Sequence, residues 1–197
     1  MSSSEETQRF RLGLHVDASD GRCGKLTRVV MDPAAQSLTH LVITPPHHTE
    51  LARLVSVDVV EAVERDTIRL RCTKQEFDQL DVAVDVQFLP ADTDPMPFHA
   101  TDTAHSTGSG RPEPIYSDRI PVGEVEISRG DAVHAKDGWI GAVQGLVIDP
   151  SDNRVTHVLL QEGHFWGRKQ VAIPIGSAAR IGDEVRVDLT KEELGKL

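Results

Sequence analysis

The chain contains the same pattern of residues twice, and this internal repeat constrains its fold more than any other feature. The first copy extends over residues 13–80 and the second over residues 130–197. The turn signal Asp20-Gly21 in the first copy corresponds to Asp137-Gly138 in the second. Each copy is longer than a solenoid repeat, which has a period of roughly 20 to 50 residues. The repeat therefore predicts two domains with the same architecture.

Each copy consists of short segments typical of β-strands. From Phe10 to Val16 apolar residues alternate with polar or small ones, which is the pattern of a half-buried strand. Further strands are predicted at 26–31, 37–44, 54–57 and 68–72. The second unit is predicted to begin with an entry strand at 125–127, followed by strands at 142–148, 155–160, 171–175 and 185–189. Many short strands at spacings of roughly 8 to 12 residues indicate a small antiparallel barrel.

A short helix is predicted after the last strand of each copy. Thr73 and Glu76 fit a capping box, in which each side chain accepts a hydrogen bond from a backbone donor of the first turn. Thr190 and Glu193 repeat this pattern in the second copy.

The predicted fold class is all-β, with two small antiparallel β-barrels, each closed by a short C-terminal helix and joined by a flexible linker. We expect a first domain at residues 8–89, a linker at 90–114 that is rich in Pro, Thr, Ser and Gly, and a second domain at 115–197. Residues 82–88 form an additional alternating strand, which we expect to pair with the other unit or to complete its own barrel. Units this small are only marginally stable alone, so we expect them to pack together or to oligomerise.

Charge and cysteine usage limit the possible partners and compartments. The formal net charge of -10 and the pI of about 5.3 oppose direct binding to nucleic acid. No apolar run approaches the roughly 20 residues that span a bilayer, and the first residues do not resemble a signal peptide. The only cysteines, Cys23 and Cys72, suit a reducing compartment. We therefore expect a cytoplasmic protein without a membrane span.

The order and spacing of these motifs resemble the PRC-barrel family, the module of the photosynthetic reaction-centre H subunit and of the C-terminal part of the ribosome maturation factor RimM. In the second copy the resemblance rests on Asp137-Gly138, Gly141, Val143, residues 146–150, 155–160, 173–175 and 185–189. In the first copy it rests on Asp20-Gly21, Gly24, Leu26, residues 29–33, 38–43, 55–57 and 68–70. The resemblance implies tandem PRC-barrel domains that act as a non-enzymatic docking module and often contact protein.

The most unusual segment lies between Gly163 and Lys169, where two aromatic residues adjoin in a chain with few aromatics. Trp and Arg are favoured anchors at protein interfaces. The candidate partner-binding residues are His164, Phe165, Trp166, Arg168, Lys169 and Trp139. The alternative is that Phe165 and Trp166 close a barrel end or pack against the other unit. Trp139 can likewise cover a barrel end or serve as a binding platform.

Metal and catalytic sites are not expected. His40 and His157 occupy equivalent positions, but each provides one ligand where structural zinc needs four. The adjacent His47 and His48 would face opposite ways on a strand. The chain has no phosphate-binding glycine loop, no nucleophile elbow and no His-Glu-x-x-His motif. The sequence therefore predicts no cofactor, no metal and no enzymatic activity.

The leading hypothesis is a non-catalytic cytoplasmic adaptor or scaffold that binds a protein partner through the Phe165-Trp166 face or the groove between the units. One alternative, by analogy with the family, is a factor associated with ribosome or RNA maturation. That alternative requires a basic cluster, formed by Arg154, Arg168, Lys169 and Arg180. A second alternative is a sensor of a small ligand or metal, which requires a cavity or a cluster of ligands.

Overall fold

The computed structural model describes residues 7–46, 51–88, 114–162, 170–180 and 184–195, in which the chain is mostly β-structure with two short helices. The first half contains β1 (Gln8–Arg11), β2 (His15–Ala18), β3 (Gly21–Asp32), β4 (Ser37–Thr44), β5 (Arg53–Ser56), the 3-10 turn η2 (Val57–Val59), β6 (Val60–Val63), β7 (Thr67–Leu70), α1 (Lys74–Phe77) and β8 (Val84–Phe88). The second half contains β9 (Pro114–Asp118), β10 (Val125–Ser128), β11 (Ala132–Ala135), β12 (Gly138–Ile148), β13 (Val155–Glu162), β14 (Gln170–Pro174), η3 (Ile175–Ser177), β15 (Ala178–Arg180), β16 (Val185–Val187) and α2 (Lys191–Leu194). Neither described α-helix is long or apolar enough to cross a membrane.

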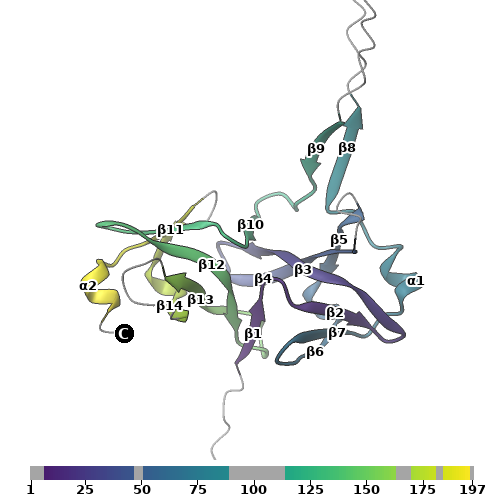
Figure 1. The fold of residues 1–197 in the computed structure, drawn as a ribbon, viewed down its shortest axis with the longest axis horizontal. Helices are drawn as coiled ribbons and strands as arrows, with labels where there is room; N and C mark the ends of the chain where they lie inside the picture. Colours follow the sequence, from purple (N-terminus) through teal and green to yellow (C-terminus); the bar gives the residue numbers. More distant parts are fainter. Residues whose placement is uncertain (1–6, 47–50, 89–113, 163–169, 181–183, 196–197) are drawn as a thin grey trace, which may run out of the picture.

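The strands form two seven-stranded sheets and one two-stranded ribbon (Figure 1). One sheet has the order β5-β4-β3-β2-β7-β6, and the other has the equivalent order β14-β13-β12-β11-β16-β15. In both sheets one neighbouring pair is parallel, β2 with β7 and β11 with β16. The prediction of a mostly β fold with few helices is confirmed.

The seventh strand of each sheet comes from the other half of the chain. β1 pairs with β12, and β10 pairs with β3. Figure 1 shows β1 beside β12 and β10 beside β3. The sequence predicts that the strand around Phe10 belongs to the first unit and the strand at 125–127 to the second. The structure shows instead that each half completes its large sheet with β1 or β10 of the other half. We call β1 and β10 the first strands of the two halves, because β8 and β9 lie outside the large sheets.

The two exchanges are equivalent to each other residue by residue. The offset from Asp20 to Asp137, 117 positions, also relates β1 to β10 and the edge of β3 to the edge of β12. Gln8 lies opposite Ile148, and Val125 lies opposite Met31, which is the same pair after the offset. The halves are therefore related as the subunits of a two-fold symmetric dimer would be.

The exchange begins at an equivalent glycine in each half. Gly13 has a φ of +98° and Gly130 a φ of +95°, a conformation that residues with a side chain rarely adopt. Gly13 N donates to Leu26 O at 2.6 Å, so the chain is still paired with its own half at this point. One residue earlier, Leu12 N donates to Gln144 O of the other half at 2.8 Å. Gly13 is therefore the position at which the first strand leaves its own half.

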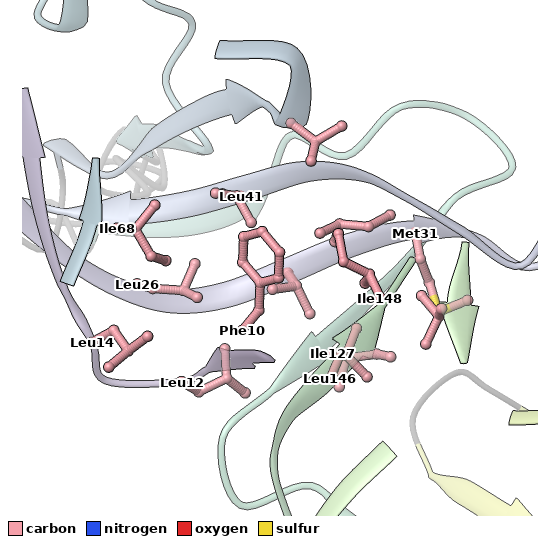
Figure 2. Packing of buried hydrophobic residues seen from close by; sticks show 14 of the residues in the cluster. Phe10, Leu12, Leu14, Leu26, Met31, Leu41, Ile68, Ile127, Leu146 and Ile148 are labelled. Carbon is pink, nitrogen blue, oxygen red and sulfur yellow. The ribbon is translucent and has the colours of Figure 1, made fainter. Parts of the chain in front are cut away.

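Side chains from both halves form one continuous hydrophobic core. Phe10 of β1 and Ile127 of β10 are completely buried, and they belong to the same cluster as Leu26 and Leu146. Figure 2 shows Phe10 among residues of β3, β4 and β12. Burying a side chain such as Phe contributes roughly 1.5 to 3 kcal/mol. The exchanged strands thus carry part of the core of each half.

The strand expected at 82–88 pairs with β9, which lies almost entirely in the expected second domain, and does not complete the sheet of its own half. β8 forms an antiparallel ribbon with β9, with Val84 opposite Asp118 and Phe88 opposite Pro114. The ribbon projects away from the two large sheets (Figure 1). Arg119 N donates to Ala83 O at 2.8 Å, which brings the chain back to the first half just before β10. The ribbon therefore explains how β10 reaches β3. Of the predicted linker, residues 90–113 lie outside the described residues, and Pro114 already belongs to β9.

The local predictions about turns and caps agree with the structure. Both capping boxes are present, with Thr73 paired with Glu76 and Thr190 paired with Glu193. Gly24 adjoins a bulge between β2 and β3, and a Cβ atom there would come within 2.5 Å of Thr44 O. A side chain cannot fit so close to a backbone carbonyl, which is the reason for a glycine at this position.

Candidate functional site

Five of the six candidate partner-binding residues lie outside the described part of the chain. They are His164, Phe165, Trp166, Arg168 and Lys169, all within residues 163–169. The choice between an exposed binding loop and a covered barrel end therefore stays a prediction.

Trp139 is the one predicted site residue that the structure describes. It lies near the start of β12, and half of its surface is exposed (50%). Only two other large hydrophobic side chains are exposed among the described residues, Leu51 and Val122. Trp139 lies opposite His134 of β11, and His134 lies opposite Arg186 of β16. Paired residues on neighbouring strands point to the same side of a sheet. Arg186, His134 and Trp139 therefore form a row across three strands.

The equivalent row in the first half has a different chemistry. It consists of Arg69, Asp17 and Arg22, which lie on β7, β2 and β3 in the same pairing. Arg22 Nε donates to Asp17 Oδ1 at 3.0 Å, and Arg69 lies within 3.7 Å of the carboxylates of Glu61 and Glu64 outside the row. In the second half an indole stands where Arg22 stands in the first. The two halves thus share a backbone but present different surfaces.

The turn that precedes Trp139 is anchored to α2. Asp137 Oδ1 accepts a hydrogen bond of 3.0 Å from Lys191 N, the first residue of the helix. The first half has the same bond, from Lys74 N to Asp20 Oδ1 at 2.8 Å. A backbone donor of the first helical turn is satisfied in this way, and a carboxylate near a helix N-terminus is favourable. The turn therefore holds the start of β12 in place.

Polar groups flank the indole. His134 Nδ1 lies 3.4 Å from Glu184 Oε2, and Arg186 Nη2 donates to the same oxygen at 3.4 Å. A large aromatic side chain with a polar rim is the usual composition of a protein-binding patch. Sequence reasoning identified Trp139 but not His134, Glu184 or Arg186, because only the parallel pairing of β11 with β16 brings these segments together.

A second feature is a pocket of about 330 Å³ at the junction of the halves. A groove between the units was one of the two expected binding sites, but the sequence analysis named no residues for it. Its lining comes from both halves and consists of residues 37–40, 56–58, 124, 152 and 153. Thr39 Oγ1 donates to Glu124 Oε2 at 2.6 Å, and His40 Nδ1 lies 3.5 Å from the same oxygen. This volume is at the lower end of the range for ligand pockets, and the lining is polar where such pockets are mostly apolar.

The histidines considered as metal ligands have other neighbours. His40 lies beside Glu124, and His157 Nδ1 lies 3.0 Å from Thr156 Oγ1. Within the described residues, no three His, Cys, Asp or Glu side chains form a group that could hold a metal ion. His47 and His48 lie outside these residues.

Both cysteine thiols are poor nucleophiles. Cys23 is buried and its thiol donates to Val16 O at 3.2 Å. Burial, followed by the effect of the nearby Cys72, raises the pKa of Cys23 to about 12. Burial also raises the pKa of Cys72 above its ordinary value. A thiolate rather than a thiol is the reactive form, so neither site is activated.

The basic cluster required by the RNA-associated alternative is described only in part. Arg168 and Lys169 lie outside the described residues, and the side chain of Arg180 is likewise not described. Arg154 is largely exposed, and its Nε lies 3.6 Å from Asp152 Oδ2. The one side chain of this cluster that the structure describes, Arg154, thus has a carboxylate beside it.

The comparison with protein families gives a match within the second half. Residues 129–194 match the model of the PRC-barrel domain family. The match begins directly after β10 and includes Trp139, the anchored turn and α2. β10 precedes the matched PRC-barrel segment, and β1, from the other half, occupies the edge of its sheet. No curated protein matches the chain.

Proposed function

We propose that the protein is a non-catalytic cytoplasmic adaptor that binds a protein partner through its PRC-barrel half, with Trp139 as an anchor. We further propose that the first half is a second PRC-barrel unit. Its strand order, its anchored turn and its capped helix are the same as those of the matched half. Each barrel would be completed by a strand of the other half.

The observation that supports the binding role is the difference between the two three-strand rows. Arg22 in the first half is neutralised by Asp17, whereas Trp139 in the second half leaves half of its surface exposed. If binding buried a further 100 Å² or so of the indole, the contribution would be roughly 2.5 kcal/mol. That is enough to change an affinity by well over tenfold. Duplicated units with the same backbone and different surfaces are consistent with one unit that binds and one that supports.

The test has two stages. The full-length protein is first used as bait in an extract of its native cells, and a captured protein is identified and purified. Its affinity for the bait is then measured by calorimetry with the wild type, Trp139→Arg and Arg22→Ala. Trp139→Arg gives the second half the residue of the first, and we expect it to weaken binding at least about tenfold. Arg22→Ala, at the equivalent position, should leave the affinity nearly unchanged.

Two results would contradict the proposal. An unchanged affinity of Trp139→Arg would remove Trp139 from the binding site, and a parallel Trp166→Ala variant would then show whether the aromatic segment binds instead. Turnover of a metabolite by the purified chain, with no captured protein, would exclude the adaptor role.

A further inference from the structure

Arg28 lies on the edge of β3 that receives the exchanged strand β10. Its Nη1 lies 3.0 Å from both carboxylate oxygens of Glu126, and Ser128 is directly opposite Arg28 in the register. The two charged side chains are mostly covered, with exposed fractions of 19% and 16%. Ser128 Oγ also donates to Glu126 Oε1 at 3.1 Å. A mostly covered ion pair is screened less by salt than an exposed one.

The same edge would look different if each half kept its own first strand. β1 would then occupy the place of β10, with Arg9 at the position of Glu126 and Arg11 at the position of Ser128. Arg28 would face two arginines instead of a carboxylate and a hydroxyl. Like charges on directly paired strands are destabilising, whereas opposite charges stabilise.

The backbone permits either arrangement. β2 pairs with β3 with Val16 opposite Gly24 and His15 opposite Lys25. Gly13 and Leu14 continue this pairing through hydrogen bonds with Leu26. If β1 extended the strand β2 backwards from Leu14, it would therefore pair with the edge of β3 in nearly the register that β10 has. Backbone hydrogen bonding does not decide between the strands, so side chains must.

The edge of β12 suits the strand that β3 would repel. Arg9 lies opposite Val147 and Arg11 lies opposite Gly145, so β1 meets no cation in these pairs. The position equivalent to Arg28 in the second half is Gly145. The arginine-containing strand is thus paired with the edge that has no arginine.

We propose that Arg28 selects the reciprocal exchange of the first strands, by attracting Glu126 of β10 and repelling Arg9 and Arg11 of β1. The interaction surface is the β3 edge around Arg28. The partner that it fits is a strand with a carboxylate at the position of Glu126, and in this chain that strand belongs to the other half. The exchanged strands hold the two halves together by non-covalent contacts, in addition to the peptide chain that connects the halves.

Two pairs of cysteines report which strand occupies which edge. In the full-length chain with Cys23→Ala and Cys72→Ser, the pair Arg9→Cys and Val147→Cys reports exchange. The pair Arg9→Cys and Val30→Cys reports a retained strand, because Val30 is the equivalent of Val147. The hydrogen bond from Leu12 N to Gln144 O places residues 9 and 147 at a non-hydrogen-bonded pair. Their Cα atoms are therefore about 4.5 Å apart, within the range of a disulfide.

We expect the 9–147 pair to oxidise within one chain and the 9–30 pair to stay reduced, as resolved by non-reducing electrophoresis and peptide mass spectrometry. Both reporters replace Arg9 and keep Arg11, which would lie opposite Arg28 in a retained strand. Arg28→Glu should then lower the ratio of 9–147 to 9–30 cross-linking by about fivefold or more. Adding Glu126→Arg to Arg28→Glu should raise the ratio only in part. The attraction to β10 is remade with opposite polarity, but a carboxylate at position 28 still attracts Arg11 of β1. Arg186→Glu reverses an exposed arginine on β16, a strand that pairs with neither exchanged strand, and serves as the control.

Each other outcome overturns part of the proposal. Oxidation of the 9–30 pair without Arg28→Glu would show that each half keeps its strand. A 9–147 disulfide between two chains would show exchange between molecules rather than between halves. An unchanged ratio in Arg28→Glu would remove Arg28 as the selecting residue. Should Arg28→Glu fail to fold, Glu126→Gln tests the same attraction, and no change in the ratio with this variant would overturn the role of the ion pair.

Discussion

Ser37 and Arg154 face each other in an antiparallel bridge between the two halves, and each is the equivalent of the other in the repeat. Two backbone hydrogen bonds of 2.8 Å flank the bridge, from Leu38 N to Asn153 O and from Val155 N to Gln36 O. The same offset relates these two bonds, so an approximate two-fold axis passes between Ser37 and Arg154. Each half therefore satisfies backbone groups of the other as well as completing its sheet.

The shared core predicts that both halves unfold in one transition. Phe10→Ala removes a completely buried side chain that belongs to β1 but packs in the sheet of the second half. Such a substitution costs roughly 3 to 5 kcal/mol. Hydrogen exchange should show loss of protection in both halves with a common midpoint. Leu51→Ala, at an exposed position, is the control, and loss of protection in one half alone would contradict the prediction.

We predict that a glycine is required at position 145 for the close pairing of β1 with β12. A Cβ atom at this position would overlap Phe10 O and the Cα of Arg11, which are backbone atoms that cannot rotate away. We expect Gly145→Ala to lower the free energy of unfolding by roughly 1 to 3 kcal/mol in urea titrations. Gly176→Ala, with no atom within 4 Å of its Cβ, should cost much less. Equal costs would show that β1 does not approach β12 this closely.

The contact between Thr39 and Glu124 can be isolated by comparing the halves. Thr39 Oγ1 lies 3.0 Å from Val30 O and Thr156 Oγ1 lies 3.1 Å from Val147 O, but only Thr39 also reaches a carboxylate. Thr39→Val should therefore destabilise the chain more than Thr156→Val, by roughly 1 kcal/mol in chemical denaturation. The reverse order would mean that the bond to Glu124 adds nothing to stability.

The capping box of α1 predicts a pH-dependent contribution. Hydrogen bonds from the backbone and the hydroxyl of Thr73 lower the pKa of Glu76 below its ordinary value of 4.5. A lowered pKa gives stability that is present above the ordinary value and lost as the pH falls through the folded-state pKa. Thr73→Ala should lower the melting temperature by roughly 2 to 4 °C at pH 7. The difference from the wild type should shrink in calorimetry below pH 4.5, and a constant difference would argue against this ionisation.

The buried thiol of Cys23 predicts the opposite pH dependence. Its pKa is raised to about 12 from an ordinary value of 9.0, so the folded state keeps the proton where the unfolded state loses it. This stability is complete below pH 9 and is lost as the pH rises toward 12. We expect Cys23→Ala to flatten the fall of stability in this range. Iodoacetamide should also modify the half-buried Cys72 before Cys23, as peptide mass spectrometry would show, and equal rates would contradict the burial of Cys23.

Local structure followed from local chemistry. The turns at Asp20-Gly21 and Asp137-Gly138 and the capping boxes at Thr73 and Thr190 were predictable, because each depends on neighbours within a few residues. The duplication was visible for the same reason, since both copies carry these signals in one order. Trp139 was found as a candidate because an aromatic residue next to a turn is conspicuous in an aromatic-poor chain.

Contacts between distant segments were not predictable in the same way. The row of Arg186, His134 and Trp139 depends on a parallel pairing of strands that are about fifty residues apart in the chain. The junction pocket depends on Glu124 and Asp152 meeting a strand of the other half. No sequence pattern marks either site, because their residues are adjacent only after folding.

Each copy contains its own alternation, turn residues and caps, so two equivalent β units are predictable from the amino-acid order alone. The sheet that each first strand joins is not predictable in this way. β1 and β10 carry the same alternation, and the edges of β3 and β12 offer them the same backbone hydrogen bonds in the same register. Because the two edges are equivalent in backbone hydrogen bonding, the pairing depends on side-chain contacts between the halves. These contacts form only in the folded protein.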